Sequence, residues 1–381
     1  MAEYLTNTTD LTKVAAAIRE KGGTSDPLVY PDGFVTAIQA IQTGTELQII
    51  VSVTSGATVT ATKGSKVVSG TAINGTCTLT VPEAGTWSVK ATHNGQTSGT
   101  KSVTFTDRYA LSLFFVSAVL NDNDWSKIKS VSDTGQGANY WSVGDRKAVT
   151  LNGTVGHLTL SNYTTYAFII GFNHNAELEG SNRIHFQLAK TALSGGTDVC
   201  FCDDEYAPES EWSRPGAGYF VMNASDTNSG GWKSSQMRTN ICGTSLLSYS
   251  GTIIAVIPAA LRAVLKSVTK YTDNTANGGG STASYVTATT DYFFLLSECE
   301  IYGAVSIGNK NEKNKQAQYA YYSAGNSKIK YKHNRTSVAA LYLLRSPQAG
   351  ASDRFVYINT DDTHNATVAG CSLGFAPGFC V

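Results

Sequence analysis

The sequence has little charge and few prolines. Of its 381 residues, only 15% are Asp, Glu, Lys or Arg, against about 25% in an average soluble domain. With 8 prolines and 36 glycines, the composition excludes a collagen-like fibre and a proline-rich disordered chain. The 29 basic residues balance the 29 acidic ones, so no overall field attracts nucleic acid or an anionic membrane. Uncharged Ser, Thr, Asn and Tyr are common instead, which favours a β-rich exterior protein.

Targeting and membrane-spanning segments are also missing. The first nine residues contain neither a basic region nor an apolar run, so no secretory signal is visible. The most apolar stretch, residues 109–120, is too short to cross a bilayer, and we expect a buried strand there. These features predict a protein made in the cytoplasm without a signal peptide.

The common catalytic motifs are absent as well. The sequence has no zinc-protease helix motif, no nucleophile elbow and no phosphate-binding or dinucleotide-binding loop. Asp133-Thr134-Gly135 matches the aspartic-protease triplet, but that chemistry needs a second carboxylate that shares the proton. Because the triplet follows an amphipathic segment, we predict a helix-terminating turn there. We predict no enzymatic activity and no cofactor.

Metal-binding patterns are weak. The seven cysteines lack zinc-site spacing, and Cys200-x-Cys202 has no second pair, so we predict buried free thiols. The acidic runs 203–205 and 361–362 lack the alternating ligands of a calcium loop. Solvated loops are therefore expected at both runs, and also around Glu312 with its neighbouring lysines. We predict no bound metal.

Two histidines, His174 and His185, are close in sequence and have apolar flanks. A ligand or metal pair is one alternative. A buried network with Asn173, Asn175 and Gln187 is favoured, because a neutral imidazole packs well once both ring nitrogens have partners.

Residues 1–44 show the helical period. Apolar residues recur at Leu11, Val14, Ala15 and Ile18, and a second stripe runs from Phe34 through Ile38 to Ile41, with Pro31 before it. Two such helices bury little surface by themselves. We therefore predict a helical hairpin that docks onto another subunit, another virion protein or the rest of the chain.

Residues 45–107 switch to an alternation of period two. Cys77, Leu79 and Val81 alternate with threonines, and Trp87 begins a second such run. Asn74-Gly75 and Asn94-Gly95 are tight-turn signals. Six or so short strands predict a small β-sandwich, similar to the immunoglobulin-like modules that space phage and bacterial surface proteins.

Residues 108–381 contain no internal linker or repeat and are long enough for one large core. Helices are expected near 124–131 and from Pro258 onward, where Leu261, Val264, Leu265 and Val268 form an apolar stripe. Short strands and long Gly, Asn, Ser and Tyr-rich loops fill the remainder. The fold class predicted for the whole chain is α+β, β-rich and multidomain.

Two segments resemble known families. The segment KGGTSDPLVYPDGFVTAIQAI, residues 21–41, resembles the N-terminal module of prophage tail and minor structural proteins. The large region resembles a domain of formally unknown function that is widespread in prophages of Gram-positive gut bacteria. Its anchor segments are Trp125–Ile128, Ala138–Asp145, Phe172–Asn175, Ile184–Gln187, Met222–Asn223, Gly230–Arg238, Leu295–Glu298, Leu344–Pro347 and Phe375–Phe379.

That family in turn is similar to C-type-lectin-like and formylglycine-generating-enzyme-like folds. The closing pattern, LRSP followed by GFAPGF, resembles the end of variable proteins that are diversified by retroelements. The resemblance implies a rigid scaffold with ligand-binding side chains near the C-terminus. The enzymes' active-site cysteine pair and the calcium motifs of animal lectins are absent, so it does not imply catalysis or calcium-dependent sugar binding.

The predicted ligand-binding residues lie in two loops, at 318–326 and 342–365. Tyr provides a large, stiff contact area, and Ser, Asn and Asp provide adaptable hydrogen bonds. Ordinary polar loops are the competing interpretation. The predicted contact residues are Tyr319, Tyr321, Tyr322, Asn326, Tyr342, Ser352, Asp353, Arg354, Tyr357, Asn359, Asp361, His364 and Asn365.

These patterns together predict a receptor-binding protein, or adhesin, of a phage or prophage tail, located in the virion. The expected partners are a host-cell surface protein or glycan and other tail proteins, without nucleic acid or membrane. A homo-oligomer is expected, with a trimer as one alternative. The competing hypotheses are a purely structural virion component and an enzyme acting on cell-surface polymer.

Overall fold

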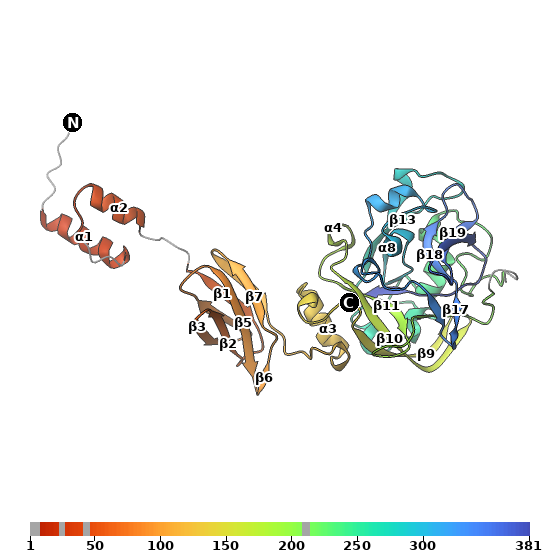
Figure 1. Cartoon of the computed structure of the whole chain (residues 1–381), viewed down its shortest axis with the longest axis horizontal. Coiled ribbons are helices and arrows are strands. Elements are labelled where there is room, and N and C mark those ends of the chain that lie inside the picture. The colour runs from red at the N-terminus through yellow and green to blue at the C-terminus, as the bar shows by residue number, and fades with distance from the viewer. Residues whose placement is uncertain (1–7, 23–26, 41–45, 208–213) are drawn as a thin grey trace. The chain divides into compact units, whose positions relative to one another are not determined.

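The computed structural model describes residues 8–22, 27–40, 46–207 and 214–381. The chain divides into two compact units, residues 1–115 and residues 116–381 (Figure 1). We call them the small unit and the large unit. Both are rich in strands and contain several small sheets, so the predicted β-rich protein of mixed α and β content is confirmed at that level. Within the described ranges, no helix has the length and apolarity needed to cross a bilayer.

The small unit begins with two helices, α1 (Thr8–Gly22) and α2 (Asp32–Ala40), as predicted. Ala15, Ile18 and Phe34 form their buried contact. Val14 and Ile38, which we also placed in the apolar stripes, are 47% and 53% exposed. Two short helices cover only a narrow stripe of each other, which leaves these two side chains outside the contact. Ile41 lies outside the described residues.

Two sheets form the rest of the small unit. One has the strand order β4-β1-β8, and the other has the order β3-β2-β5-β6, with β7 paired to β5. The strands are β1 (Gln48–Ser52), β2 (Thr58–Lys63), β3 (Lys66–Thr71), β4 (Thr76–Thr80), β5 (Gly85–His93), β6 (Gln96–Thr97), β7 (Lys101–Phe105) and β8 (Arg108–Ser112).

One core joins these two sheets, and the alternating sequence explains it. Ile49, Leu79 and Trp87 come from strands of both sheets and are at most 2% exposed. Both predicted tight turns are present. In each of them the Asn and the Gly have positive φ, as a two-residue hairpin turn of the mirror-image type requires.

The predicted boundary between residues 107 and 108 is wrong. Strand β8 pairs in parallel with β1, and the amide of Leu113 donates to Ser52 O at 2.9 Å. Leu111 and Leu113 are buried in the core of the small unit, which therefore extends to Phe115. The apolar stretch 109–120 forms a strand only as far as Ser112, and Val119 is 57% exposed.

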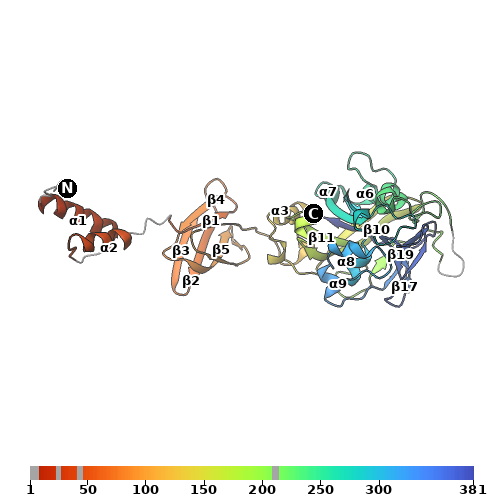
Figure 2. The same cartoon turned by 90° about the horizontal axis from the view of Figure 1, so that it is seen from above.

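The main sheet of the large unit has the order β15-β21-β11-β10-β9. It comprises β9 (Arg146–Val155), β10 (Leu158–Phe172), β11 (Ile184–Lys190), β15 (Phe293–Phe294) and β21 (Gly378–Cys380). The C-terminal strand β21 thus lies in the interior of the sheet, and the last residue, Val381, is fully buried. In Figure 2, α6 and α7 lie on one side of β10 and β11, and α8 and α9 lie on the other side.

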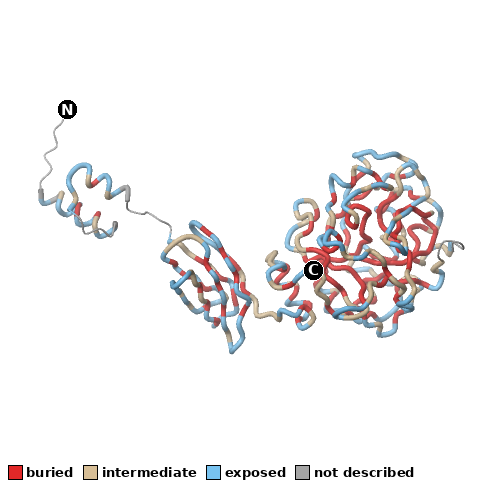
Figure 3. The backbone as a smooth tube through the Cα atoms, in the orientation of Figure 1, coloured by how far each residue is buried: buried red, intermediate tan, exposed pale blue. Residues whose placement is uncertain are grey.

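Three smaller sheets complete the large unit, with the orders β12-β16-β17, β13-β14 and β18-β19-β20. Their strands are β12 (Val199–Cys200), β13 (Val268–Asp273), β14 (Val286–Asp291), β16 (Lys330–Lys332), β17 (Arg335–Ala340), β18 (Tyr342–Pro347), β19 (Arg354–Ile358) and β20 (His364–Val368). Buried backbone runs through the middle of this unit, with exposed loops around it (Figure 3).

The helices of the large unit are short. They are η1 (Leu120–Asp122), α3 (Trp125–Asp133), η2 (Gly137–Asn139), α4 (Ala176–Glu179), α5 (Gly231–Ser234), η3 (Met237–Cys242), α6 (Ile253–Val256), α7 (Ala259–Arg262), η4 (Ala283–Tyr285), α8 (Glu298–Tyr302), η5 (Lys310–Asn314) and α9 (Ala320–Ser323). Most of them serve as single-turn connections between strands.

The two helices predicted for the large unit differ in outcome. Helix α3 has the expected apolar face, and Asp124 caps it by accepting from Lys127 N at 2.8 Å. The triplet 133–135 terminates this helix, with Gly135 at φ +71°, so the predicted turn is confirmed. Helix α7 starts after Pro258 as expected but ends at Arg262, and Val268 belongs to β13. The helical stripe predicted there is wrong beyond the first turn.

Candidate functional site

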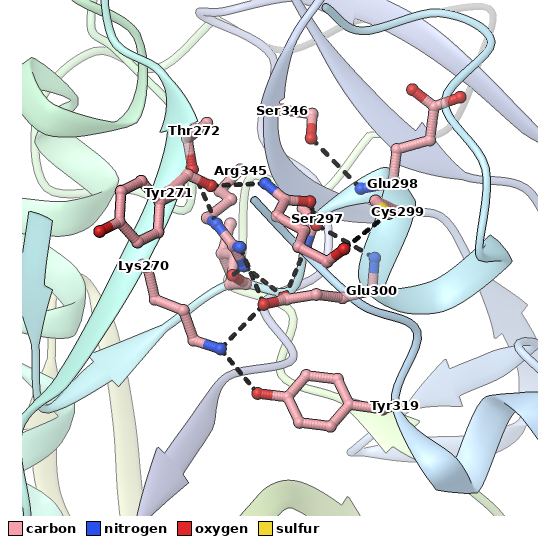
Figure 4. Close-up of polar contacts among 12 residues, drawn as sticks. Lys270, Tyr271, Thr272, Ser297, Glu298, Cys299, Glu300, Tyr319, Arg345 and Ser346 are labelled. Atoms are coloured by element: carbon pink, nitrogen blue, oxygen red, sulfur yellow. Dashed lines mark hydrogen bonds and ion pairs between the residues drawn. The ribbon is translucent and has the colours of Figure 1, made fainter. Parts of the chain in front are cut away.

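A network of charged side chains occupies the centre of the large unit. Lys270 on β13 is fully buried. Its Nζ donates to Glu300 Oε1 at 2.8 Å and to the hydroxyl of Tyr319 at 2.7 Å (Figure 4). It also donates to Glu179 Oε2 at 2.5 Å. An ammonium group has three donors, and all three have an acceptor here. Burial of this charge is therefore compensated.

Glu300 is held from a second side by Arg345 on β18. The Arg345 guanidinium forms a bidentate pair with the carboxylate, in which Nη2 donates to Oε1 at 2.9 Å. Its Nε also donates to Thr272 Oγ1 at 2.8 Å. Burial alone favours the neutral acid, but the Arg345 and Lys270 charges outweigh it and hold the pKa of Glu300 far below its usual range.

The local sequence positions Glu300 as well. Ser297 caps α8 and Glu300 is the third residue of that helix, which is the capping-box pattern. Ser297 Oγ accepts from Glu300 N at 3.1 Å, and the Glu300 carboxylate accepts from Ser297 N at 3.0 Å. One side chain thus completes a helix end and compensates two buried cations.

The two buried histidines border this network. His185 Nδ1 lies 3.0 Å from the hydroxyl of Tyr319 and 3.3 Å from Cys380 Sγ, and His174 stacks on the Tyr319 ring at 3.8 Å between centroids. Burial and the Lys270 charge lower the pKa of His174 to about 3. The predicted burial is confirmed. The predicted partners are wrong, because Tyr319 rather than the nearby Asn and Gln side chains contacts both rings.

These residues also test the metal alternative. His174, Glu179 and Glu300 each offer one ligand atom, and these atoms lie within 4.8 Å of one another. However, the Lys270 ammonium is bonded to both carboxylates. It supplies the positive charge that a cation would bring, so this arrangement works as an ion-pair network.

Two further acids are buried beside the network. Glu298 accepts from the backbone amides of residues 306–308 and lies 2.9 Å from His364 Nε2. Burial opposes its ionisation, but His364 and these amides outweigh it and lower the pKa of Glu298 to about 2. Glu312 is fully buried and accepts from Ser346 Oγ at 2.7 Å, and burial raises its pKa to about 7. The solvated loop predicted around Glu312 is therefore wrong at Glu312 itself.

The solvated loop predicted at the acidic run 203–205 is also wrong at its first residue, Asp203. Asp203 is 6% exposed and accepts from Ser372 Oγ at 2.7 Å and from Phe220 N at 2.5 Å. Asp203 thus connects the segments that contain Phe220 and Ser372, whereas Asp204 and Glu205 are exposed.

The cysteine prediction is confirmed, since all seven thiols are free and buried. Cys200 and Cys202 lie with their Sγ atoms 4.0 Å apart.

The tyrosines predicted as contact residues do not form an exposed surface. They are at most 6% exposed, and the phenols of four of them, Tyr319, Tyr321, Tyr322 and Tyr342, bond inside the unit. Tyr321 pairs with Lys190 Nζ at 2.8 Å, Tyr322 donates to Gln187 Oε1 at 2.6 Å, and Tyr342 donates to Lys328 O at 2.8 Å. A tyrosine with an internal acceptor is stable in a core, and its type alone does not distinguish core from contact surface. The buried residues in question are Tyr319, Tyr321, Tyr322, Tyr342 and Tyr357.

The remaining predicted residues divide between two ends of the β19–β20 hairpin. At the turn, Asn359 and Asp361 are partly or fully exposed, and both contact Thr363. The neighbouring Asp362 accepts from Lys328 N at 2.6 Å, which ties this turn to the segment just after the predicted loop 318–326. Asn326, His364 and Asn365 also retain exposed surface. The prediction of two polar loops is wrong in part, because α9 lies within 318–326 and β18 and β19 lie within 342–365.

The other end of the hairpin holds Ser352, Asp353 and Arg354. A pocket of about 230 Å³ lies beside them, lined by Arg214, Arg354, Ala366, Thr367 and Val368. Arg354 and Arg214 belong to segments far apart in the sequence. Sequence reasoning missed Arg214, because nothing near it indicates where its loop returns.

Sequence reasoning also missed the buried charges. A signal existed for Arg345, because a single cation interrupts the apolar run LYLLRSP. A second signal existed for Glu300, because SECE is a capping box. No local pattern distinguishes Lys270 or Glu179 from surface residues.

One comparison with known proteins gives a match. A family model described as a domain of unknown function, DUF6273, matches residues 219–381. No curated protein and no solved structure was found to match the chain. The matched region contains Lys270, Glu300 and Arg345, together with the whole β18–β19–β20 sheet. Over this region, the chain is similar to a family whose function is unassigned.

Proposed function

We propose that this chain is a receptor-binding protein of a phage or prophage tail, in which the large unit binds a host-cell surface protein or glycan. The small unit would attach the protein to the tail and space the binding unit from it. The observation that supports this best is the support given to the exposed turn of the β19–β20 hairpin. Asp362 in this turn is held by Lys328, and the sheet of β18, β19 and β20 is anchored in the buried network through Arg345.

Rigidity is the physical reason for this proposal. A binding surface that is ordered before the ligand arrives pays less conformational entropy on binding. Arg345 fixes β18, and β18 pairs with β19, which pairs with β20. The polar side chains at both ends of the hairpin are thus displayed on a supported scaffold, as in other binding domains whose loops sit on rigid sheets.

The finer fold assignments belong to the same proposal. Two sheets around one core favour an immunoglobulin-like spacer for residues 46–115. A main sheet that includes the C-terminal strand, with loop-rich surroundings, is compatible with the C-type-lectin-like scaffold that the sequence resembles. The chain would occur in the virion and assemble as a homo-oligomer with other tail proteins, and its mass in solution would test the oligomer.

A cell-binding assay with the full chain tests the function. The labelled protein is incubated with a panel of Gram-positive bacteria, and its binding is compared with that of a triple variant, Arg354→Ala, Asp361→Ala and Asn365→Ala. Lys90→Ala on the small unit is the matched control, because Lys90 is also an exposed polar residue. We expect saturable binding to some strains, its loss in the triple variant and no change in the control. Absence of binding to all strains, with incorporation into particles intact, would support a structural virion component instead.

A further inference from the structure

The pocket beside Arg354 has the size and chemistry of a small specific site. Its volume of about 230 Å³ lies below the 300–1,000 Å³ of sites for drug-sized ligands. Its lining combines two arginines with Thr367, Ala366 and Val368. A single small, polar and negatively charged group matches these dimensions and this lining.

Both arginines keep donors for a ligand. The Arg354 side chain is 48% exposed, and its Nε lies 3.7 Å from Asp353 Oδ1, beyond hydrogen-bond distance. No hydrogen bond joins the Arg354 guanidinium to another residue in the part of the chain that the structure describes. Arg214 is 55% exposed, and its Nε lies 3.1 Å from Asp226 Oδ2. Exposed pairs of this kind contribute little to stability, so a ligand carboxylate competes readily for the guanidinium groups.

The backbone around the pocket is fixed. The side chain of the fully buried Asn228 donates to Arg354 O at 3.1 Å and to Ala351 O at 2.7 Å. Asp353 O accepts from Ala369 N at 2.7 Å, and Asp226 Oδ1 accepts from Gly370 N at 3.2 Å. The lining residues from β19 and β20 are therefore held in place without a ligand.

The charge balance identifies the kind of anion. The two arginines are accompanied by two carboxylates, Asp226 and Asp353, at 33% and 37% exposure. These carboxylates repel a doubly charged phosphate more strongly than a singly charged carboxylate, which the forked donors of an arginine can hold in a bidentate pair. Carboxylates also accept hydrogen bonds from hydroxyl groups. A ligand with one carboxylate and several hydroxyl groups satisfies both kinds of side chain.

We propose that the pocket between Arg214 and Arg354 binds the carboxylate of an acidic sugar, such as a hexuronic acid residue of a surface polysaccharide. The arginines hold the carboxylate, and Asp226 and Asp353 accept hydrogen bonds from the ring hydroxyl groups. This inference rests on the proposed binding function of the large unit and names the ligand class for it.

Titration of the full chain with four probes tests the inference: methyl galacturonoside, the neutral methyl galactoside, acetate and inorganic phosphate. Binding is followed by calorimetry and by the NMR signals of the arginine Nε–H groups. We expect saturable binding of the uronoside alone, weakening as ionic strength rises. Arg354→Gln should weaken it about tenfold or more, as expected when a charge-assisted hydrogen bond is lost. Arg354→Lys should weaken it less, because the charge remains and only the fork is lost.

Arg335→Gln is the matched control, since Arg335 is exposed on β17 and does not line the pocket. Equal binding of acetate or of the neutral galactoside overturns the inference, and so does preferential phosphate binding. An unchanged affinity in Arg354→Gln also overturns it. If cells bind the chain but the uronoside does not, the sugar assignment fails while the proposed function stands. If the uronoside binds but no cell does, the pocket stands and the proposed function fails.

Discussion

The interiors of the two units are stabilised by different interactions. The small unit has an apolar core in which side chains alternate along each strand, such as Trp87 and Val89 on β5. The large unit places Lys270, Glu300 and Arg345 at its centre with no solvent exposure. An apolar core tolerates small changes of shape, whereas a buried ion network requires every partner. The comparison predicts that the two units fail for different reasons and under different conditions.

The largest effect is expected from Lys270→Met. The substitution leaves Glu179 and Glu300 without their shared cation, and removal of one partner from a buried ion network costs about 3–5 kcal/mol. We expect the large unit to unfold at lower denaturant concentration while the transition of the small unit stays in place. Denaturation followed by calorimetry and circular dichroism measures both. Lys233→Met is the control, because Lys233 is exposed. A loss below about 1 kcal/mol would show that the network is not a stabilising centre.

The reciprocal experiment is Leu79→Ala in the small unit. Leu79 is 2% exposed, and truncation of a buried leucine costs about 2–5 kcal/mol through lost transfer energy and a cavity. Only the transition of the small unit should shift. A coupled shift of the large unit in the same scan would contradict the division of the chain at residue 115.

Acidification should lower the stability of the large unit more than that of the small unit. His174 and His333 in the large unit are buried with pKa values lowered to about 3 and about 4, mainly by burial. Because their folded pKa values lie below the ordinary value of 6.5, the unfolded state binds more protons. Stability is therefore lost as the pH falls below about 6.5, by about 3 kcal/mol per histidine near pH 4.5. Thermal unfolding between pH 7 and about pH 4.5 measures this.

At lower pH, protonation of Glu298 should destabilise the large unit further. Its folded pKa of about 2 lies below its ordinary value, so its stabilisation is present above about pH 4.5 and is lost as the pH falls toward 2. In the described part of the small unit no histidine is buried, so its transition should respond less to acid. If the small unit loses stability first on acidification, the comparison is wrong.

The smallest effect on stability is expected from Asn365→Ala on β20. This side chain is exposed, and surface substitutions of this kind usually change stability by less than about 0.5 kcal/mol. Cell binding should nevertheless decrease if the hairpin forms the contact surface. Unchanged binding would move the surface away from this strand, and a large loss of stability would assign Asn365 a structural role.

Much of the small unit follows from local sequence. The alternation in β4 and β5 indicates which side chains face the core, because successive side chains of a strand point to opposite faces. The Asn-Gly pairs locate two turns, because few other residues adopt the required positive φ. The boundary at residue 107 was wrong, because the parallel pairing of β8 with β1 joins residues far apart in the sequence.

In the large unit, the sequence by itself determined the class of structure, the helix at α3, its terminating turn and the burial of the cysteines and of two histidines. Only the tertiary structure decided that Tyr319 and Tyr342 are internal, that Lys270 is a core residue, and that Arg214 and Arg354 line one pocket. The physical reason is that the cost of burying a polar group depends on whether a partner is present. Those partners come from segments that only the folded chain brings together.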